Sequence, residues 1–237
     1  TFDQFDRLNC ISNFSGSAGL AVITKDKNYL FVDGRYTVQA KIQSGNFFKI
    51  FDIINNPPFK VLKNKKLGLD PKIFTKKSVD QLFSKKITIK EIEDNLIDKI
   101  IKKKVKKNNE FFSISKKITG ESKNSKINRV TKYLNKVKAD YLFITAPENV
   151  AWLLNIRGND NPNSPIPNCH LIITKKKEIF LFTSRNKIKK ILKDNTIKKK
   201  QFAELSEIKS YLNKFDKVNF VIDKNSCSLF YENLIKR

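Results

Sequence analysis

The stretch from Phe31 to Ala40 reads FVDGRYTVQA, and it decides the fold class because a strand pattern passes directly into a helix pattern. Its apolar beginning stops at Asp33-Gly34, a pair typical of a turn. Residues 36–44 (YTVQAKIQS) then suit a short helix that Gly45 closes. A strand that leads straight into a helix is the unit from which α/β domains are built.

The same alternation continues outward from this stretch. Leu20–Thr24 and Tyr29–Asp33 are apolar runs joined by four polar residues, which predicts a hairpin. In the helix that follows, Val38 and Ile42 are expected to share one face. Further strands are predicted over residues 47–54, 66–71, 87–89, 139–145, 171–174, 179–182 and 218–222. Further helices are predicted over residues 78–83, 95–101, 122–138, 147–154 and 226–236. This pattern predicts an α/β fold with mixed sheets flanked by helices.

Residues 102–121 interrupt the pattern, because they are polar and basic and show no sustained periodicity. They are the best candidate for a linker, and we expect two domains, at residues 1–115 and 116–237. The chain contains no methionine. We therefore expect it to be a fragment of a longer protein, with its first domain truncated at the start.

The net charge of +25 raises the possibility of nucleic-acid binding, since lysine and arginine neutralise phosphates. Nearly all of the 48 basic residues are lysines, however, whereas base readout and bidentate phosphate recognition favour arginine. The lysines are also scattered along the chain. We expect a solvated lysine surface and no nucleic-acid partner.

Composition also bears on location. No run approaches 18 consecutive apolar residues, so no membrane-spanning helix and no membrane partner are expected. The three cysteines, Cys10, Cys169 and Cys227, form neither a zinc spacing nor a disulfide framework. Reduced thiols in the cytoplasm are the expectation.

Residues for catalysis are scarce. His170 is the one histidine, so a metal site with two histidines cannot form, and a structural role for this residue is favoured over a Ser-His-Asp triad. Gly16 and Gly19 precede a strand, whereas a dinucleotide fingerprint needs its glycines between a strand and a helix. We expect neither a catalytic residue nor a metal ligand in this chain.

Two arginines stand in distinctive motifs. Arg35 follows Asp33-Gly34, where Asp33 can simply cap the helix, or the guanidinium can hold a carboxylate or carbonyl at the carboxyl end of a strand. Arg157 is expected in the last turn of a helix that Gly158 closes. There it either complements the helix dipole or belongs to a loop that faces another domain or an active site.

At these motifs the chain resembles the Xaa-Pro aminopeptidase branch of the creatinase/prolidase family. The resemblance rests on ordered segments over nearly the whole chain, which are NFSGSAG (13–19), FVDGRYTVQA (31–40), LGLDP (67–71), GES (120–122) and ITAPENVAWLLNIRGNDNPNSP (144–165). It implies two creatinase/prolidase N-terminal-like domains, each a mixed sheet flanked by helices.

The resemblance also implies a function. Long members of the family remove an N-terminal residue that precedes proline, and they use two divalent metal ions, usually manganese, in a third, pita-bread domain. That domain is expected to be absent from this chain, which would then be inactive alone and would shape the active-site entrance and the interface of a homodimer. Arg35 inherits contact with the peptide substrate, and Asp33 and Tyr36 would support it. The alternative is a stand-alone binding module without enzymatic activity.

Overall fold

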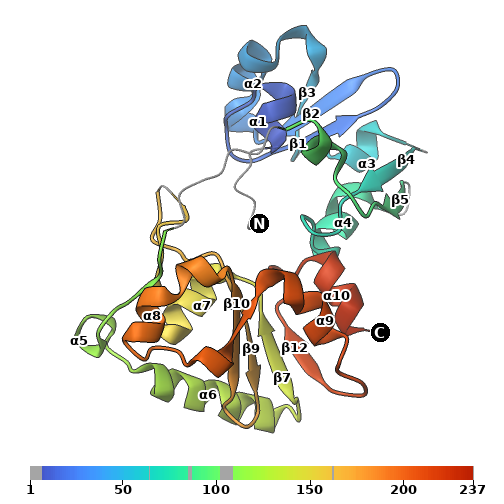
Figure 1. Cartoon of the computed structure of the whole chain (residues 1–237). Helices are drawn as coiled ribbons and strands as arrows, with labels where there is room; N and C mark the ends of the chain where they lie inside the picture. The colour runs from blue at the N-terminus through green and yellow to red at the C-terminus, as the bar shows by residue number, and fades with distance from the viewer. Residues whose placement is uncertain (1–6, 64, 85–86, 102–108, 162, 237) are drawn as a thin grey trace. The chain divides into compact units, whose positions relative to one another are not determined.

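A computed structural model of the chain describes residues 7–63, 65–84, 87–101, 109–161 and 163–236. These residues form two compact units, one over residues 7–101 and the other over residues 109–236 (Figure 1). Both units are α/β structures with mixed sheets and helices, which confirms the fold class expected from the sequence.

The elements of the first unit follow the predicted order closely. They are α1 (Arg7–Ser12), β1 (Gly19–Ile23), β2 (Asn28–Val32), the 3₁₀ helix η1 (Gly34–Tyr36), α2 (Thr37–Ser44), η2 (Gly45–Phe47), β3 (Lys49–Asp52), α3 (Pro58–Val61), β4 (Lys66–Leu69), α4 (Lys76–Phe83), β5 (Thr88–Glu91) and η3 (Leu96–Lys99).

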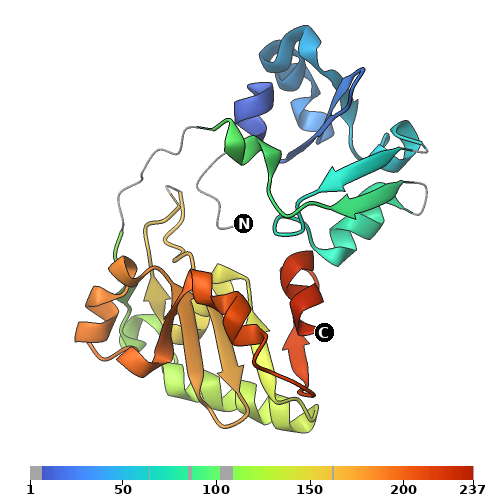
Figure 2. The same ribbon diagram turned by 45° about the vertical axis from the view of Figure 1, so that its right-hand side comes forward.

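The sheet of the first unit has the order β1-β2-β3. β1 and β2 are antiparallel and form the predicted hairpin, in which the backbone N–H of Thr24 donates to the carbonyl of Lys27. β2 and β3 are parallel, so both strands end at the same edge of the sheet. β4 and β5 form a separate parallel pair in this unit (Figure 2).

Helix α2 buries a face other than the one that carries Val38 and Ile42. Val38 and Ile42 do share a face, but both are mostly exposed. The buried positions are Ala40 and Ser44, and the hydroxyl of Ser44 donates to the carbonyl of Ser12. The buried face of α2 therefore carries small side chains. The hydrogen bond of Ser44 shows that this face packs against the segment that precedes β1.

The elements of the second unit again alternate. They are β6 (Phe112–Ser113), α5 (Lys116–Thr119), α6 (Lys123–Lys136), β7 (Tyr141–Ile144), α7 (Pro147–Leu154), β8 (Ile156–Arg157), β9 (His170–Thr174), β10 (Ile179–Thr183), η4 (Arg185–Lys187), α8 (Lys189–Lys193), η5 (Lys199–Gln201), β11 (Phe202–Glu204), η6 (Leu205–Glu207), α9 (Ile208–Leu212), β12 (Phe220–Ile222) and α10 (Leu229–Ile235).

The sheet of the second unit has the order β11-β10-β9-β7-β12 and buries both faces (Figure 1). Leu171 and Ile173 on β9 pack with apolar residues of α6, α7 and α8. Ile172, between them, packs on the opposite face with residues of α9 and α10. Every residue of β9 is buried, because a strand covered on both sides needs a continuous apolar run.

The division between the units falls earlier than the boundary expected at residues 115 and 116. Phe111 is fully buried in the core of the second unit, and β6 pairs with β8. Residues 109–115 therefore belong to the second unit, because an aromatic ring and a short strand anchor them there. Of the predicted linker, residues 102–108 lie outside the described residues.

The predicted helix over residues 147–154 matches α7, but the expected place of Arg157 in the last turn of a helix closed by Gly158 is wrong. Helix α7 ends at Leu154, and Asn155 supplies the left-handed backbone conformation, with φ of 54°, that stops it. Arg157 lies in β8, not in a last helical turn before Gly158. Asparagine adopts this conformation more readily than most residues and so can replace glycine as the terminating residue.

Candidate functional site

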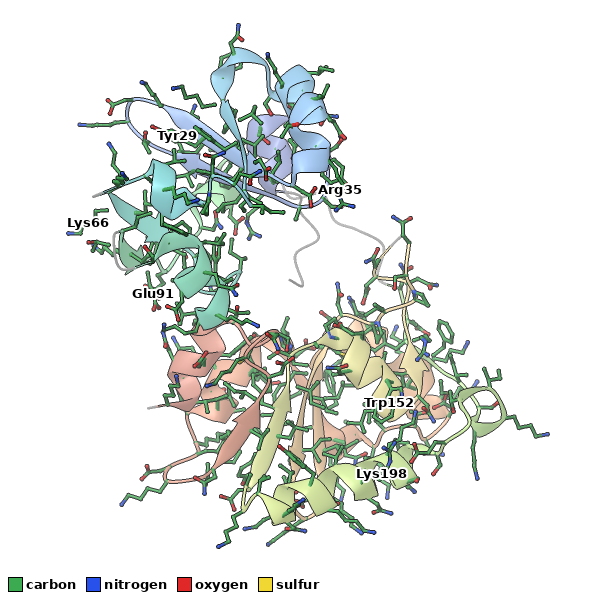
Figure 3. The ribbon with its side chains drawn as sticks, turned by 180° about the vertical axis from the view of Figure 1, so that it is seen from behind. Tyr29, Arg35, Lys66, Glu91, Trp152 and Lys198 are labelled. Carbon is green, nitrogen blue, oxygen red and sulfur yellow. The ribbon has the colours of Figure 1, made fainter. Side chains whose placement is uncertain are left out.

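The predicted site residue Arg35 lies directly after β2, at the sheet edge where β3 also ends. Asp33 organises this turn, because its carboxylate accepts a hydrogen bond from the backbone N–H of Arg35 at 3.0 Å. The same carboxylate accepts from Nε and Nη2 of Arg35 at 2.9 and 3.1 Å. Asp33 therefore caps the helix η1 and also binds the side chain of Arg35, which is labelled in Figure 3.

Electrostatics keep this pair ionised. The hydrogen bonds from the Arg35 side chain lower the pKa of Asp33, and the same interaction raises the pKa of Arg35. The Arg35 side chain is 77% exposed, and its Nη1 has no hydrogen-bond partner among the described residues. A guanidinium that is held by one edge can offer its remaining donors to a carbonyl or carboxylate.

A side chain at position 34 would be crowded by a neighbour on β3. A Cβ atom at this position would stand 3.3 Å from Oδ2 of Asp52. Asp52 is itself engaged, because it accepts hydrogen bonds from the backbone N–H of Ile54 and the side chain of Asn55. Two carboxylates therefore stand on either side of the turn that carries Arg35.

Tyr36 connects this turn to the core of the first unit. Its ring makes an edge contact with the fully buried Phe14, with the centroids 6.0 Å apart. The guanidinium of Arg35 stands 5.7 Å from the centroid of the Tyr36 ring. Tyr36 thus packs between the buried Phe14 and the exposed arginine, and its role in supporting Arg35 stays a prediction.

The second group of motif residues meets around a buried cation that sequence reasoning missed. Lys126 on α6 is 2% exposed, and its Nζ donates to the carbonyl of Trp152 and to Oδ1 of Asn155, at 2.8 and 2.6 Å. The same Nζ lies 4.4 Å from the centroid of the Trp152 ring. Asn155 in turn donates to the carbonyl of Glu121. Burial lowers the pKa of Lys126.

This arrangement explains why the GES and AWLLNIRG segments occur together. Through Asn155 and Lys126, the end of α7 is joined to the start of α6, and Glu121 also pairs with Arg129. Lys126 stands four residues before Val130 and eight before Leu134, so the three side chains share one face of α6. Because this face packs against the core, the spacing was a signal that the Lys126 side chain is buried. The cluster of Lys126, Asn155 and Trp152 therefore stabilises the second unit. Trp152 is labelled in Figure 3.

A buried ion pair fixes the proline-rich loop that follows Arg157. Nζ of Lys187 lies 2.7 Å from Oδ1 of Asp160, and these side chains are 7% and 3% exposed. Oδ2 of Asp160 accepts from the backbone N–H of Asn168 at 2.7 Å. The two ends of the loop are therefore tied to each other and to η4.

His170 lies in the core rather than in a catalytic arrangement. It is 3% exposed, its Nδ1 is 3.2 Å from the carbonyl oxygen of Thr145, and its ring contacts those of Phe143 and Tyr231. Burial lowers the pKa of this imidazole to about 3 from an ordinary value of 6.5. The folded protein therefore keeps it neutral where the unfolded chain takes up a proton.

This difference predicts a loss of stability in acid. Above pH 6.5 both states are neutral at His170, and the effect is absent. As the pH falls from 6.5 towards 3, the unfolded state gains a proton that the folded state does not, which costs about 1.4 kcal/mol per pH unit. Urea unfolding followed by the fluorescence of Trp152 should show this dependence weakened in His170→Gln. Equal slopes of unfolding free energy against pH in the two proteins would contradict it.

The described part of the chain contains neither a cluster of metal ligands nor a helix that could span a membrane. No group of three or more histidine, cysteine, aspartate or glutamate side chains there could hold a metal ion. No helix among the same residues combines the length and the apolar content needed to cross a bilayer.

The fold and these motifs define a pair of creatinase-type N-terminal domains. The family description "Creatinase/Prolidase N-terminal domain" matches residues 6–100 in one form and residues 102–237 in a second form. The chain belongs to the creatinase/prolidase N-terminal domain family.

Among curated proteins, Xaa-Pro aminopeptidases are similar in sequence to this chain. Xaa-Pro aminopeptidase 1 of Dictyostelium discoideum is 31% identical over 233 residues, which is 89% of this chain and 37% of that protein. Aminopeptidase P1 of Lotus japonicus is 31% identical over 84% of this chain and 32% of its own length. The chain is thus homologous to the N-terminal part of Xaa-Pro aminopeptidases and spans about a third of the length of these relatives.

A solved structure agrees on the fold. The X-prolyl aminopeptidase of Caenorhabditis elegans, described as a cytosolic enzyme with a di-nuclear active site, superposes with a TM-score of 0.76. The match covers 88% of this chain and 36% of that enzyme, at 24% identity.

Proposed function

We propose that this chain forms the non-catalytic N-terminal part of a metal-dependent Xaa-Pro aminopeptidase, which hydrolyses the bond between an N-terminal residue and proline. The observation that carries the proposal is the match to proteins of that name over 84–89% of this chain. Its peptide substrate would have proline at the second position. The two domains would shape the entrance to an active site and an interface of a homodimer.

The residues described here do not fit the metal ions of such an enzyme, because they contain no group of ligands for one. The C. elegans enzyme has a di-nuclear site, and this chain matches 36% of it. We infer that two divalent metal ions, with manganese as the first candidate, would be held outside the described residues. No step of the reaction is assigned to residues of this chain.

Arg35 is the residue through which the chain would take part in substrate binding. The support is its exposed guanidinium, which Asp33 fixes by two hydrogen bonds while Nη1 remains available. Asp33 and Tyr36 would act by holding this side chain in place. The ligand would be a carbonyl or carboxylate oxygen of the peptide, which suits a planar donor group.

The place of action would be the cytoplasm. The C. elegans enzyme is described as cytosolic, and the cysteines support the same location, because two of the three are buried free thiols.

Manganese alone should not make this chain a peptidase. We expect the isolated 237-residue chain to release no amino acid from an Xaa-Pro peptide when manganese is present. The protein expressed from the complete reading frame should release it. Turnover by the isolated chain would contradict the assignment of its two domains, and a reading frame that stops after Arg237 would favour a binding module instead.

A further inference from the structure

The loop from Ser15 to Gly19 lies beside the Arg35 turn and is held by two glutamines of α2. Nε2 of Gln43 donates to the hydroxyl oxygen of Ser15 at 2.9 Å, and Oε1 of Gln43 accepts from the backbone N–H of Ser15 at 3.0 Å. Gln39 adds a hydrogen bond to the same hydroxyl at 3.3 Å and one to Gln43 at 3.2 Å. The contacts between Gln43 and Ser15 join residues 28 positions apart in the sequence.

The inner side of the loop is closely packed. A Cβ atom on Gly16 would stand 2.5 Å from the ring of Phe14 and 3.0 Å from that of Tyr36. A Cβ atom on Gly19 would stand 2.9 Å from the side chain of Leu8. Both glycines therefore let the backbone approach the rings, and the loop rests on the same Tyr36 ring that the Arg35 guanidinium approaches.

The loop also has backbone donors that bind no other group among the described residues. Ser17 and Ala18 are exposed, and Gly16 is half-buried. Within the described part of the chain, no hydrogen bond engages the backbone N–H of Gly16, Ser17 or Ala18. Successive backbone N–H groups in a turn form a surface that receives oxygen atoms.

We propose that Gly16–Ala18 is a second contact for the peptide that Arg35 binds, and that its N–H groups receive main-chain carbonyl oxygens of the substrate. This inference rests on the function proposed above. The loop offers few side-chain atoms, so it would recognise peptide backbone and not a particular residue. Gln43 is then a positioning residue, since it holds Ser15 by two hydrogen bonds.

The test is steady-state kinetics of the protein from the complete reading frame, loaded with manganese, on Ala-Pro-Ala. Gln43→Ala should raise KM about 3- to 10-fold and leave kcat within about twofold, because contacts made equally in the ground and transition states change KM alone. Gln43→Glu keeps the acceptor for the Ser15 N–H, so its KM should lie between the KM of the wild type and that of Gln43→Ala. Lys41→Ala, an exposed change on the same helix, should have no effect.

A double variant separates the loop from the arginine. Gln43→Ala should raise KM further in a protein that already carries Arg35→Ala, because the loop makes its own contact. No further rise would show that the loop acts only through Arg35 and would overturn the inference. Wild-type kinetics of Gln43→Ala beside an impaired Arg35→Ala would also overturn it and leave the proposed function standing. Wild-type kinetics of Arg35→Ala would instead remove Arg35 from the substrate site.

Discussion

Arg35→Ala should lower kcat/KM for Xaa-Pro peptides about 10- to 100-fold in the protein expressed from the complete reading frame. The physical reason is the loss of a charge-assisted donor group that Asp33 already holds in place. Arg35→Lys should recover a part of the activity, since an ammonium keeps the charge but cannot make the paired contacts of a guanidinium. The measurement is the initial rate of release of the N-terminal residue over a range of peptide concentrations.

The matched control for this experiment is Arg185→Ala in the second unit. The Arg185 side chain is 76% exposed, nearly the same as the 77% of Arg35, and it also stands near a carboxylate. Its removal should leave kcat/KM unchanged. An equal loss in the two variants would mean that the general charge of the surface, and not a site at Arg35, attracts the substrate.

Lys187→Met should destabilise the second unit by about 3–5 kcal/mol and lower its Tm by about 10 °C or more. The change leaves Asp160 charged and buried, with the backbone N–H of Asn168 as its remaining hydrogen-bond partner among the described residues. Trp152 is the one tryptophan of the chain and belongs to this unit, so its fluorescence reports the unfolding directly. Lys189→Met, at an exposed position two residues away, should change the Tm little.

A double variant tests the stated reason. Asp160→Asn combined with Lys187→Met removes both charges and keeps an acceptor for the backbone N–H of Asn168. It should be more stable than Lys187→Met alone, because an uncompensated buried charge costs more than the loss of the pair. If the double variant is no more stable, the cost comes from lost packing around the Lys187 side chain.

Local patterns were sufficient for most elements. The hairpin of β1 and β2, the helix that Pro147 opens and the strong amphipathic helix α6 all appear close to the predicted bounds. These features depend on residues near one another in the sequence, where turn residues and apolar periodicity act directly. The motif around Arg35 was also visible, because Asp33, Gly34 and Tyr36 are its neighbours.

The sequence did not predict which face of helix α2 is buried. Val38 and Ile42 were placed together correctly, but only the packing of α2 decides that Ala40 and Ser44 face inward. The range of the helix that Pro147 opens was predicted correctly, but Arg157 was also expected in its last turn. The sequence did not identify Asn155 as the residue that ends the helix, because the contacts of its side chain with Lys126 and Glu121 exist only in the folded unit. The position of Lys126 on the core-facing stripe of α6 was a signal for its burial, but the sequence did not show which groups its ammonium would contact.

The sequence by itself determined the α/β alternation, the presence of two domains and the family motifs, since each of these is a local or ordered pattern. Only the tertiary structure decided what surrounds Arg35. The parallel pairing of β2 and β3 brings Asp52 against Gly34, and the packing of α2 brings Gln43 to Ser15. The same holds for Asp160 and Lys187, 27 residues apart. Such contacts depend on the topology of the chain and on buried polar groups, which must find hydrogen-bond partners. The spacing of residues in the sequence predicts neither the topology nor the partners.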